Sequence, residues 1–273
     1  MSSVSLPAVA VLSRFSPVAR LALAVLVVMV LAVIAGPFLS PYSPTGIDPM
    51  AMSRPPSAAH WLGTDQFGRD ILTRILVGGS ATVGLALACT LSSVGVGTAV
   101  GLVAGYFGGR IDQLLMRSMD VLLALPSLLI ALMILAVFGN STGILIAAIT
   151  VMFVPPVSRV ARTAAMQVAS LPFIDAARIR KESTPGIIVL EILPNMLPVI
   201  AVESGLRFSY TILTLASLGF LGLGVQPPTP DWGLMINEGR AYIGQAPWIV
   251  FGPALAIVLL VLSINILLDE LTI

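Results

Sequence analysis

The stretch LALAVLVVMVLAVIAGPFL at residues 21–39 decides the fold class of this chain. It contains no charged side chain and matches the roughly 20 residues that an α-helix needs to cross a bilayer. It is too long for the apolar part of a signal peptide, which has about 7–15 residues. Arg14 and Arg20 precede it, so we expect the N-terminus to stay in the cytoplasm.

The composition of the whole chain points the same way. Apolar residues make up 57% of the sequence and charged residues only 10%, whereas a soluble domain carries about 25% charged residues. The net charge of +1 gives no indication of nucleic-acid binding. The single cysteine, Cys89, excludes an internal disulfide and a cysteine metal site. The chain therefore belongs to the membrane class, and we expect no metal site.

We predict an all-α polytopic membrane protein in which residues 1–273 form one membrane domain. Helices are the expected spanning elements because backbone polar groups must be satisfied inside lipid. The alternating pattern of a membrane barrel is absent from the sequence. The six predicted transmembrane helices cover residues 21–39, 77–107, 121–138, 143–158, 196–223 and 247–268.

The placement of Lys and Arg predicts the orientation of these spans. Cytoplasmic segments attract Lys and Arg, and nine of them would lie inside against four outside. Both termini and the loop 159–195 would then be cytoplasmic, with outer loops at 40–76 and 225–246. The inner set is Arg14, Arg20, Arg110, Arg117, Arg159, Arg162, Arg178, Arg180 and Lys181, and the outer set is Arg54, Arg69, Arg74 and Arg240.

The two outer loops are rich in proline, which supplies rigid turns. One interpretation is that they cap helix ends, with Trp61, Trp232 and Trp248 as anchors at the membrane interface. The other is a docking rim for an external partner. The candidate rim residues are Trp61, Asp65, Arg69, Asp70 and Trp232.

Small residues recur every four positions in the second predicted span. Such a stripe lets two helix backbones approach closely in lipid, so it predicts packing and not chemistry. The stripe consists of Cys89, Ser93, Gly97, Gly101, Gly105 and Gly109. The fourth span reaches Pro155 and Pro156, which should kink or end the helix.

The sequence argues against an enzyme. A phosphate-binding loop needs a lysine after a glycine-rich turn, but the only lysine, Lys181, lies between Arg180 and Glu182. The only histidine, His60, lies in a predicted outer loop, where it cannot serve a hydrolase inside the membrane. No pair of aspartates lies on two spans at mid-membrane depth, as a membrane aspartic protease requires.

Ion-coupled transport remains an alternative because two ionisable residues lie within the fifth span. Glu203 and Arg207 are four residues apart, so they can pair on one helix face. They could line a translocation path, form a neutral pair, or face a partner subunit. The inverted repeats of broken helices found in secondary transporters are not visible in the sequence.

The predicted cytoplasmic loop 159–195 has helical character at residues 172–179. Asp175 lies early in this segment, where an acid suits a helix N-terminus, and Ala176 and Ala177 offer a small surface. Thr184-Pro185-Gly186 predicts a break before a second short helix from Ile187, and Pro194 would turn the chain into the fifth span. Two such helices would form a protruding knob able to transmit motion. The alternative is an ordinary amphipathic interfacial loop.

The loop resembles the E-A-A-x-x-x-G coupling motif of binding-protein-dependent ABC importer permeases. Four further blocks are similar to the C-type permeases for dipeptides, oligopeptides and nickel, and the five blocks keep their order. They are HWLGTDQFGRD at 60–70, GYFGG at 105–109, SLGFLGLG at 217–224, and the run from Gln226-Pro227-Pro228 to Trp232-Gly233. The resemblance implies the type I importer permease fold and a place in a bacterial inner membrane.

The resemblance also implies partners for this chain. A homologous second permease would complete the pathway, two cytoplasmic ATPase subunits would dock on the coupling loops, and a substrate-binding protein would deliver cargo outside. ATP and magnesium would be bound by the ATPases and no cofactor by this chain, which would otherwise contact membrane lipid. The implied coupling residues are Asp175, Ala176, Ala177, Arg178, Lys181, Pro185, Gly186 and Pro194.

The sequence departs from the motif at two positions of this loop. Asp175 replaces the motif's glutamate, and Lys181 stands where the motif has glycine. Glycine at such a break usually supplies a positive φ, which lysine adopts reluctantly. Either the turn has moved to Pro185-Gly186 or the loop is strained at Lys181. The chain also stops soon after its last span, where relatives usually continue with a short charged tail.

These observations predict a permease subunit that imports dipeptides or short oligopeptides. Within the same family, nickel or another small cargo is the alternative. A membrane scaffold without a translocation path is the alternative from a different class, and a secondary transporter is the third.

Overall fold

The structure is a computed structural model that describes residues 15–272. Within that range the chain is helical and contains no β-strand beyond one isolated bridge between Thr64 and Asp70. The helices are α2 (Pro17–Leu39), η1 (Pro49–Ala51), α3 (Ile71–Phe107), α4 (Gly109–Leu123), α5 (Ser127–Phe138), α6 (Thr142–Ala169), α7 (Pro172–Ile179), α8 (Thr184–Gly186), η2 (Ile187–Ile192), α9 (Leu193–Phe220), α10 (Trp232–Gly239), η3 (Arg240–Tyr242) and α11 (Trp248–Thr272).

Five of these helical segments are long and apolar enough to cross a membrane. They are Pro17–Leu39, Ile71–Phe107, Thr142–Ala169, Thr184–Phe220 and Trp248–Glu270. A sixth span results if α4 and α5 are counted together, although they are bent by 83° at the break between them. The predicted helical membrane fold is therefore confirmed, with five or six spans.

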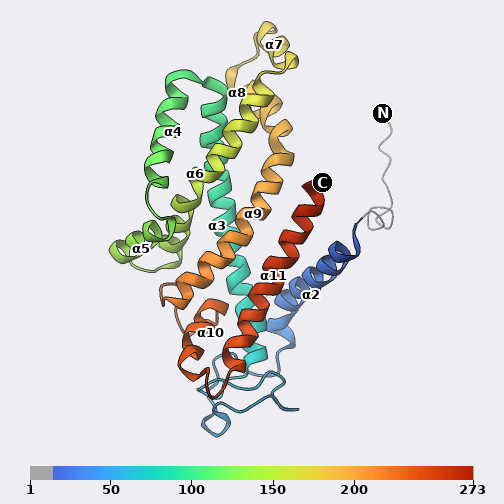
Figure 1. The fold of residues 1–273 in the computed structure, drawn as a ribbon, viewed down its shortest axis with the longest axis vertical. Helices are drawn as coiled ribbons and strands as arrows, with labels where there is room; N and C mark the ends of the chain where they lie inside the picture. Colours follow the sequence, from blue (N-terminus) through green and yellow to red (C-terminus); the bar gives the residue numbers. More distant parts are fainter. Residues whose placement is uncertain (1–14, 273) are drawn as a thin grey trace. The chain divides into compact units, whose positions relative to one another are not determined.

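The chain divides into two compact units. Unit 1 comprises residues 1–83 and 215–273, and its long helices α2 and α11 pack against each other (Figure 1). The carboxylate of Glu270 on α11 accepts hydrogen bonds from the backbone N–H and the hydroxyl of Ser16, at 2.8 and 3.0 Å. Because Ser16 is also the N-cap of α2, these bonds join the start of α2 to the end of α11.

Unit 2 comprises residues 84–214, and α6 is its central helix, with α4 and α5 packed on it (Figure 1). The close helix packing predicted from the small-residue stripe is found at Gly97, Gly101 and Gly105 of α3, which lie against α6. A Cβ added at Gly97 would lie 2.6 Å from Cβ of Val157, and one at Gly105 would lie 2.7 Å from the carbonyl oxygen of Arg162. Gly109 is an exception to the prediction, because it begins α4 with a positive φ of 54°.

The predicted third span, 121–138, is wrong in its boundaries. α4 begins at Gly109 and ends at Leu123, and α5 begins only at Ser127. Pro126 explains the break, because proline disfavours helical geometry in the residue before it and cannot donate to the preceding turn. The charged residues of α4 gave no sign of a span, so the sequence prediction began too late.

The predicted fourth and fifth spans also differ from the structure. α6 continues through Pro155 and Pro156 to Ala169, because membrane helices tolerate proline where neighbouring groups satisfy the freed backbone. Consequently the predicted loop 159–195 is mostly helical. The predicted second short helix from Ile187 is instead part of the continuous helical segment Thr184–Phe220, and Pro194 lies inside that segment without turning the chain.

Candidate functional site

α7 is a short helix with one buried face and one exposed face, at one end of unit 2 (Figure 1). Ile174 and Ala177 are fully buried. They belong to an apolar cluster that also contains residues of α3, α6, η2 and α9, including Leu102, Ala161, Ala165, Ile187, Ile192 and Met196. The predicted small surface is therefore half wrong, since Ala176 is exposed but Ala177 is part of the core.

The exposed face of α7 carries Pro172, Asp175, Ala176 and Ile179, which recur at helical spacing. Ile179 is 81% exposed, although it is a large apolar side chain. Asp175 accepts a hydrogen bond from Nη1 of Arg178 at 3.0 Å, and the Arg178 guanidinium lies 5.7 Å from the ring centre of Tyr106. The helix thus presents an apolar strip with one ion pair beside it.

The turn that ends α7 lies at Lys181, as the glycine of the motif would predict. Lys181 has a φ of +57°. The N–H of Lys181 donates to the carbonyl of Arg178 at 3.0 Å, and the N–H of Glu182 donates to the carbonyl of Ala177 at 3.2 Å. This pair of bonds is a Schellman motif, in which glycine is usual at the position of positive φ. The turn has therefore not moved to Pro185-Gly186.

Pro185 and Gly186 lie instead in the first turn of the following helical segment. Gly186 has a helical φ of −61°, and the Ser183 hydroxyl caps this turn by accepting a bond from the Gly186 N–H at 3.3 Å. The predicted coupling residues thus fall in two groups. Asp175 to Lys181 form α7 and its terminal turn, whereas Pro185, Gly186 and Pro194 lie in the long helical segment Thr184–Phe220.

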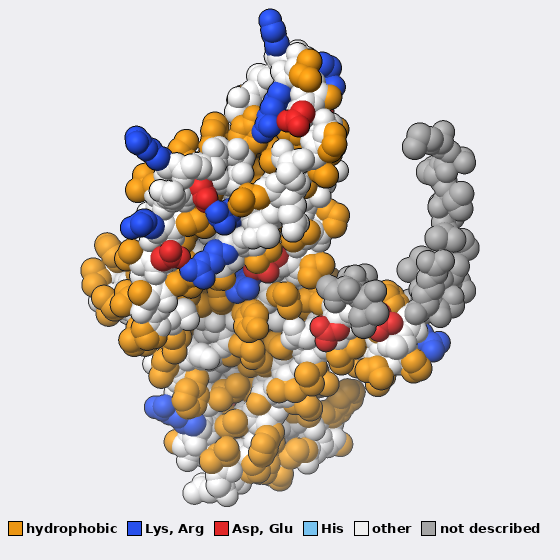
Figure 2. Space-filling view, turned by 45° about the horizontal axis from the view of Figure 1, so that its top comes forward, with side chains coloured by type: hydrophobic (Ala, Val, Ile, Leu, Met, Phe, Trp, Pro, Cys, Tyr) orange, Lys and Arg blue, Asp and Glu red, His pale blue; other side chains and the backbone are white. Residues whose placement is uncertain are grey.

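Exposed basic side chains surround this end of unit 2. Figure 2 shows Lys and Arg gathered over the region of α4 and α7. The exposed set is Arg110, Arg117, Arg159, Arg178, Arg180 and Lys181. Ion pairs join α6 to α4, with Arg159 bonded to Asp120 and Arg162 bonded to Asp112. These pairs hold α4 against α6 beside the α7 end.

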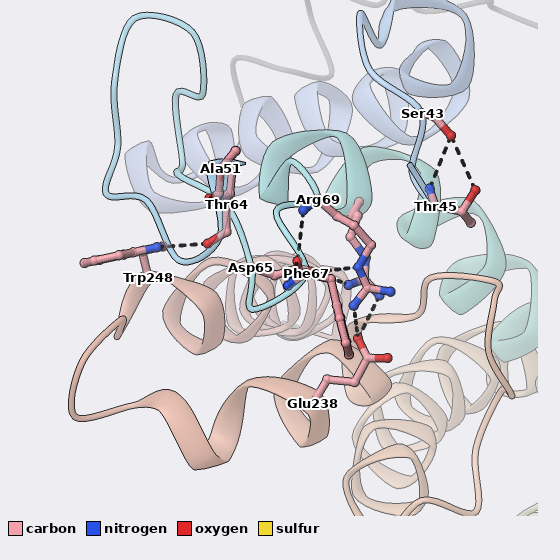
Figure 3. Close-up of polar contacts among 10 residues, drawn as sticks. Ser43, Thr45, Ala51, Thr64, Asp65, Phe67, Arg69, Glu238 and Trp248 are labelled. Atoms are coloured by element: carbon pink, nitrogen blue, oxygen red, sulfur yellow. Dashed lines mark hydrogen bonds and ion pairs between the residues drawn. The ribbon is translucent and has the colours of Figure 1, made fainter. Parts of the chain in front are cut away.

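A second polar site lies in unit 1, within the segment 40–76 (Figure 3). The Asp65 carboxylate accepts hydrogen bonds from the side chains of Arg69 and Arg74, at 2.6 and 2.5 Å. The Glu238 carboxylate on α10 accepts one bond from each of the same two arginines, at 2.8 and 2.9 Å. Two arginines and two carboxylates therefore form a neutral, largely buried cluster that joins this segment to α10.

All five candidate rim residues belong to unit 1, and four of them are buried. Asp65, Arg69, Asp70 and Trp232 are between 1% and 9% exposed, whereas Trp61 is 72% exposed. Asp70 begins α3 by accepting from the N–H of Thr73 at 2.8 Å and also contacts His60 Nδ1 at 2.9 Å. These buried side chains stabilise the segment, and a docking role for its surface stays a prediction.

Trp232 is not an interfacial anchor, because its indole N–H donates to the carbonyl of Ile75 at 2.9 Å and its ring is buried. Asp231 caps α10 by accepting from the N–H of Leu234 at 3.1 Å, and it accepts from the Thr82 hydroxyl at 2.6 Å. Burial raises the pKa of the Asp231 carboxyl, and these hydrogen bonds oppose the shift. Trp248 donates its indole N–H to the carbonyl of Thr64 at 3.2 Å.

Glu203 and Arg207 form the predicted ion pair on α9. Nε of Arg207 donates to the Glu203 carboxylate at 2.6 Å. The Arg207 side chain is 15% exposed and the Glu203 side chain 6% exposed. The Arg207 guanidinium lies 5.8 Å from the ring centre of Phe153 on α6 and 5.3 Å from that of Tyr210. The two aromatic neighbours were not identified from the sequence.

Sequence reasoning also missed Glu238, since it lies 169 residues from its partner Arg69 and no local pattern connects them. Among residues 15–272 no group of His, Cys, Asp and Glu side chains is arranged to hold a metal ion. The polar sites described above are exposed surfaces and ion pairs.

Comparisons with known proteins agree with this description. Residues 97–272 match the family "Binding-protein-dependent transport system inner membrane component", and residues 14–56 match the "N-terminal TM domain of oligopeptide transport permease C".

Three curated relatives are named as permeases for small peptides. The dipeptide transport system permease protein DppC of Alkalihalophilus pseudofirmus is 40% identical over 89% of this chain and 80% of its own length. The glutathione transport system permease protein GsiD of Pectobacterium atrosepticum is 38% identical over 86% and 78%. The probable D,D-dipeptide transport system permease protein DdpC of Escherichia coli is 36% identical over 93% and 85%.

A solved structure has a similar fold. A chain of the MetNI methionine ABC transporter, determined in inward-facing conformations, superposes with a TM-score of 0.57. The match covers 72% of this chain and 93% of the other, at 18% sequence identity. This similarity supports the predicted importer-permease fold.

Proposed function

The chain belongs to the family of binding-protein-dependent transport system inner membrane components, the permease subunits of ABC importers, and from this premise we propose that it imports dipeptides or short oligopeptides. It would form half of the translocation pathway. ATP-hydrolysing partner subunits would drive it through α7. The curated relatives support peptides over nickel as cargo, because the three described above are named for dipeptides, glutathione and D,D-dipeptides.

The observation that carries this proposal is the contrast between the two faces of α7. Its inner face, with Ile174 and Ala177, is fixed in the apolar cluster shared with α3, α6 and α9. Its outer face presents Ala176 and the 81% exposed Ile179. An exposed apolar strip on a short helix fits the mode in which a helix lies in a groove of a partner protein.

The anchoring of α7 explains how a push on this helix would reach the membrane. Packed cores rearrange between discrete states and are not continuously deformable. A partner that moves α7 would therefore move the ends of α6 and α9 with it. Closure of the two ATPase subunits around ATP would open the pathway to the outside. Hydrolysis of the ATP would return the pathway to the inward-facing state.

The proposed orientation places α7 in the cytoplasm, together with both termini. The exposed basic residues near α4 and α7 support this orientation through the positive-inside rule. The segments 40–76 and 225–246 would then face the outside, where a substrate-binding protein would deliver cargo. The exposed Trp61 is the candidate contact for that protein.

The proposed assembly contains this chain, a homologous second permease and two ATPase subunits. The ATPases would bind ATP and magnesium, whereas this chain would bind no cofactor. Lipid would cover the remaining apolar surface of the spans.

The test is the variant Ala176→Trp in the full importer, because Ala176 is exposed and its replacement leaves the buried face of α7 intact. A bulky side chain at the centre of the contact should remove about 2 kcal/mol of binding energy, or about 30-fold in affinity. We expect loss of ATPase co-purification and of peptide uptake in proteoliposomes. Ala147→Trp, at an exposed alanine of α6, is the matched control and should retain both.

Three results would count against the proposal. Normal co-purification and uptake by Ala176→Trp would separate α7 from the ATPases. Uptake that persists after the ATPase genes are deleted would favour an ion-driven carrier. A wild-type complex that imports no peptide under any condition would favour the scaffold alternative.

A further inference from the structure

The middle of α9 carries a polar face whose contact with lipid would be energetically unfavourable. Arg207 is close to the centre of Leu193–Phe220, roughly 20 Å from either end at 1.5 Å per residue. Its side chain is 15% exposed, and Tyr210 on the next turn is 52% exposed. An arginine that faces hydrocarbon is unfavourable, by about 2.5–3.5 kcal/mol or more at the centre of a bilayer, so this face of the span must meet water or protein.

The Arg207 guanidinium is held in place but is only partly satisfied. Glu203 binds it through Nε alone, and Phe153 and Tyr210 lie within about 6 Å of the guanidinium carbon, the range of cation–π contacts. Within residues 15–272 the two Nη nitrogens have no hydrogen-bond partner, and neither is a buried unsatisfied atom. These donors are therefore accessible and fixed in direction.

We propose that the Nη groups of Arg207 bind the C-terminal carboxylate of the peptide as it passes through the membrane, together with the hydroxyl of Tyr210, whose ring centre lies 5.3 Å from the guanidinium carbon. Arginine offers two parallel N–H donors that match the two oxygens of a carboxylate. The inference rests on the proposed function, because it presumes that peptide is the cargo.

Charge balance favours a passing peptide over a fixed carboxylate of a partner subunit. Glu203 already neutralises Arg207, and Glu203 is buried. A permanent second carboxylate beside Glu203 would leave a net charge of −1 within the span, which is costly in a low dielectric. A zwitterionic peptide brings its own ammonium group, so the net charge of the site stays at zero while it passes.

The test compares a dipeptide with its C-terminal amide in proteoliposomes that contain the full importer. The variant is Arg207→Gln, and uptake is expressed per ATP hydrolysed. The external binding protein is the same in every arm, so its own preference cancels when variant and wild type are compared. We expect Arg207→Gln to lower uptake of the free acid about tenfold or more and uptake of the amide less than about twofold.

Two further variants separate binding from folding. Glu203→Gln/Arg207→Gln removes both charges, so no unpaired Glu203 remains in the span, and it should show the same selective loss. Arg240→Gln is the matched control, because the Arg240 guanidinium also lies over an aromatic ring, 5.5 Å from the centre of Phe220, but outside the spans. It should leave the ratio of acid to amide uptake unchanged.

A photoreactive benzoylphenylalanine at position 210 provides the second measurement. Crosslinking to labelled dipeptide during turnover supports the proposal. Crosslinking only to the second permease, or none, overturns it in favour of a subunit contact, as does an equal loss of acid and amide uptake in Arg207→Gln. A wild-type importer that takes up no peptide refutes instead the proposed function.

Discussion

Replacing Lys181 by glycine should stabilise the end of α7. Lys181 occupies the left-handed position of the turn, with φ at +57°. A residue with a Cβ loses about 1–2 kcal/mol there, because the Cβ approaches the following carbonyl oxygen. Glycine avoids that contact but gives the unfolded chain more freedom, which offsets about 0.5–1 kcal/mol. The net gain should be about 0.5–1 kcal/mol for closing this turn.

Backbone amide hydrogen exchange measures this gain where it occurs. The N–H groups of Arg180, Lys181 and Glu182 donate to the carbonyls of Ala176, Arg178 and Ala177, so their exchange requires the turn to open. A gain of about 0.5–1 kcal/mol should slow their exchange about 2–5-fold in the purified protein. Amides in the centre of α6 should be unaffected.

Lys181→Ala is the control for the charge of lysine. It removes the ammonium group but keeps a Cβ at the same φ, so it should not slow exchange. If Lys181→Ala slowed exchange as much as Lys181→Gly, charge and not backbone strain would govern the turn. Faster exchange in Lys181→Gly would contradict the position of the turn itself.

Two further predictions concern packing and charge. Gly101→Ala should destabilise unit 2 by about 1–3 kcal/mol, because its Cβ would overlap the Ser158 carbonyl of α6. The Cβ of Gly95→Ala on the same helix would meet no atom within 4 Å, so this variant should be neutral or more stable by about 0.5–1 kcal/mol. Thermal unfolding in detergent would measure both variants, and equal effects would refute close packing. Asp65→Asn should lower the free energy of unfolding by about 3–5 kcal/mol, because it leaves Arg69 and Arg74 buried with too few partners. The control Asp48→Asn, at an exposed N-cap, should lower it by about 1 kcal/mol or less. A small effect of Asp65→Asn in the same unfolding assay would show that the cluster does not stabilise the fold.

The sequence predicts the spans well where apolar runs are uninterrupted. The first predicted span, 21–39, lies within α2, and the sixth, 247–268, matches most of α11. The predicted helix boundaries are wrong where a proline could either end a helix or lie within it. Pro126 separates α4 from α5, yet Pro155 and Pro156 lie inside a continuous α6. The same residue type has opposite results because neighbouring structure decides whether the lost hydrogen bond ends the helix.

The candidate sites divide in the same way. The turn at Lys181 follows from local spacing, because a helix that begins at Pro172 and is capped by a Schellman motif needs a positive φ at a fixed position. The contacts of Arg69 with Glu238 and of Arg207 with Phe153 join residues far apart in the chain. Arg69 meets Glu238 across 169 positions, and Arg207 meets Phe153 on a different helix. A single sequence contains no local signal for such pairs.

This difference bears on how the two sites would work. The strained residue Lys181 ends the helix proposed to receive the force, whereas an ion-paired cluster of two arginines and two carboxylates holds the segment proposed to face the outside. Backbone strain persists only where the surroundings fix it, and here the buried Ile174 and Ala177 do so. Relieving the strain by Lys181→Gly should therefore leave α7 docked. Transport should survive in the Lys181→Gly variant, whereas Ala176→Trp should abolish it.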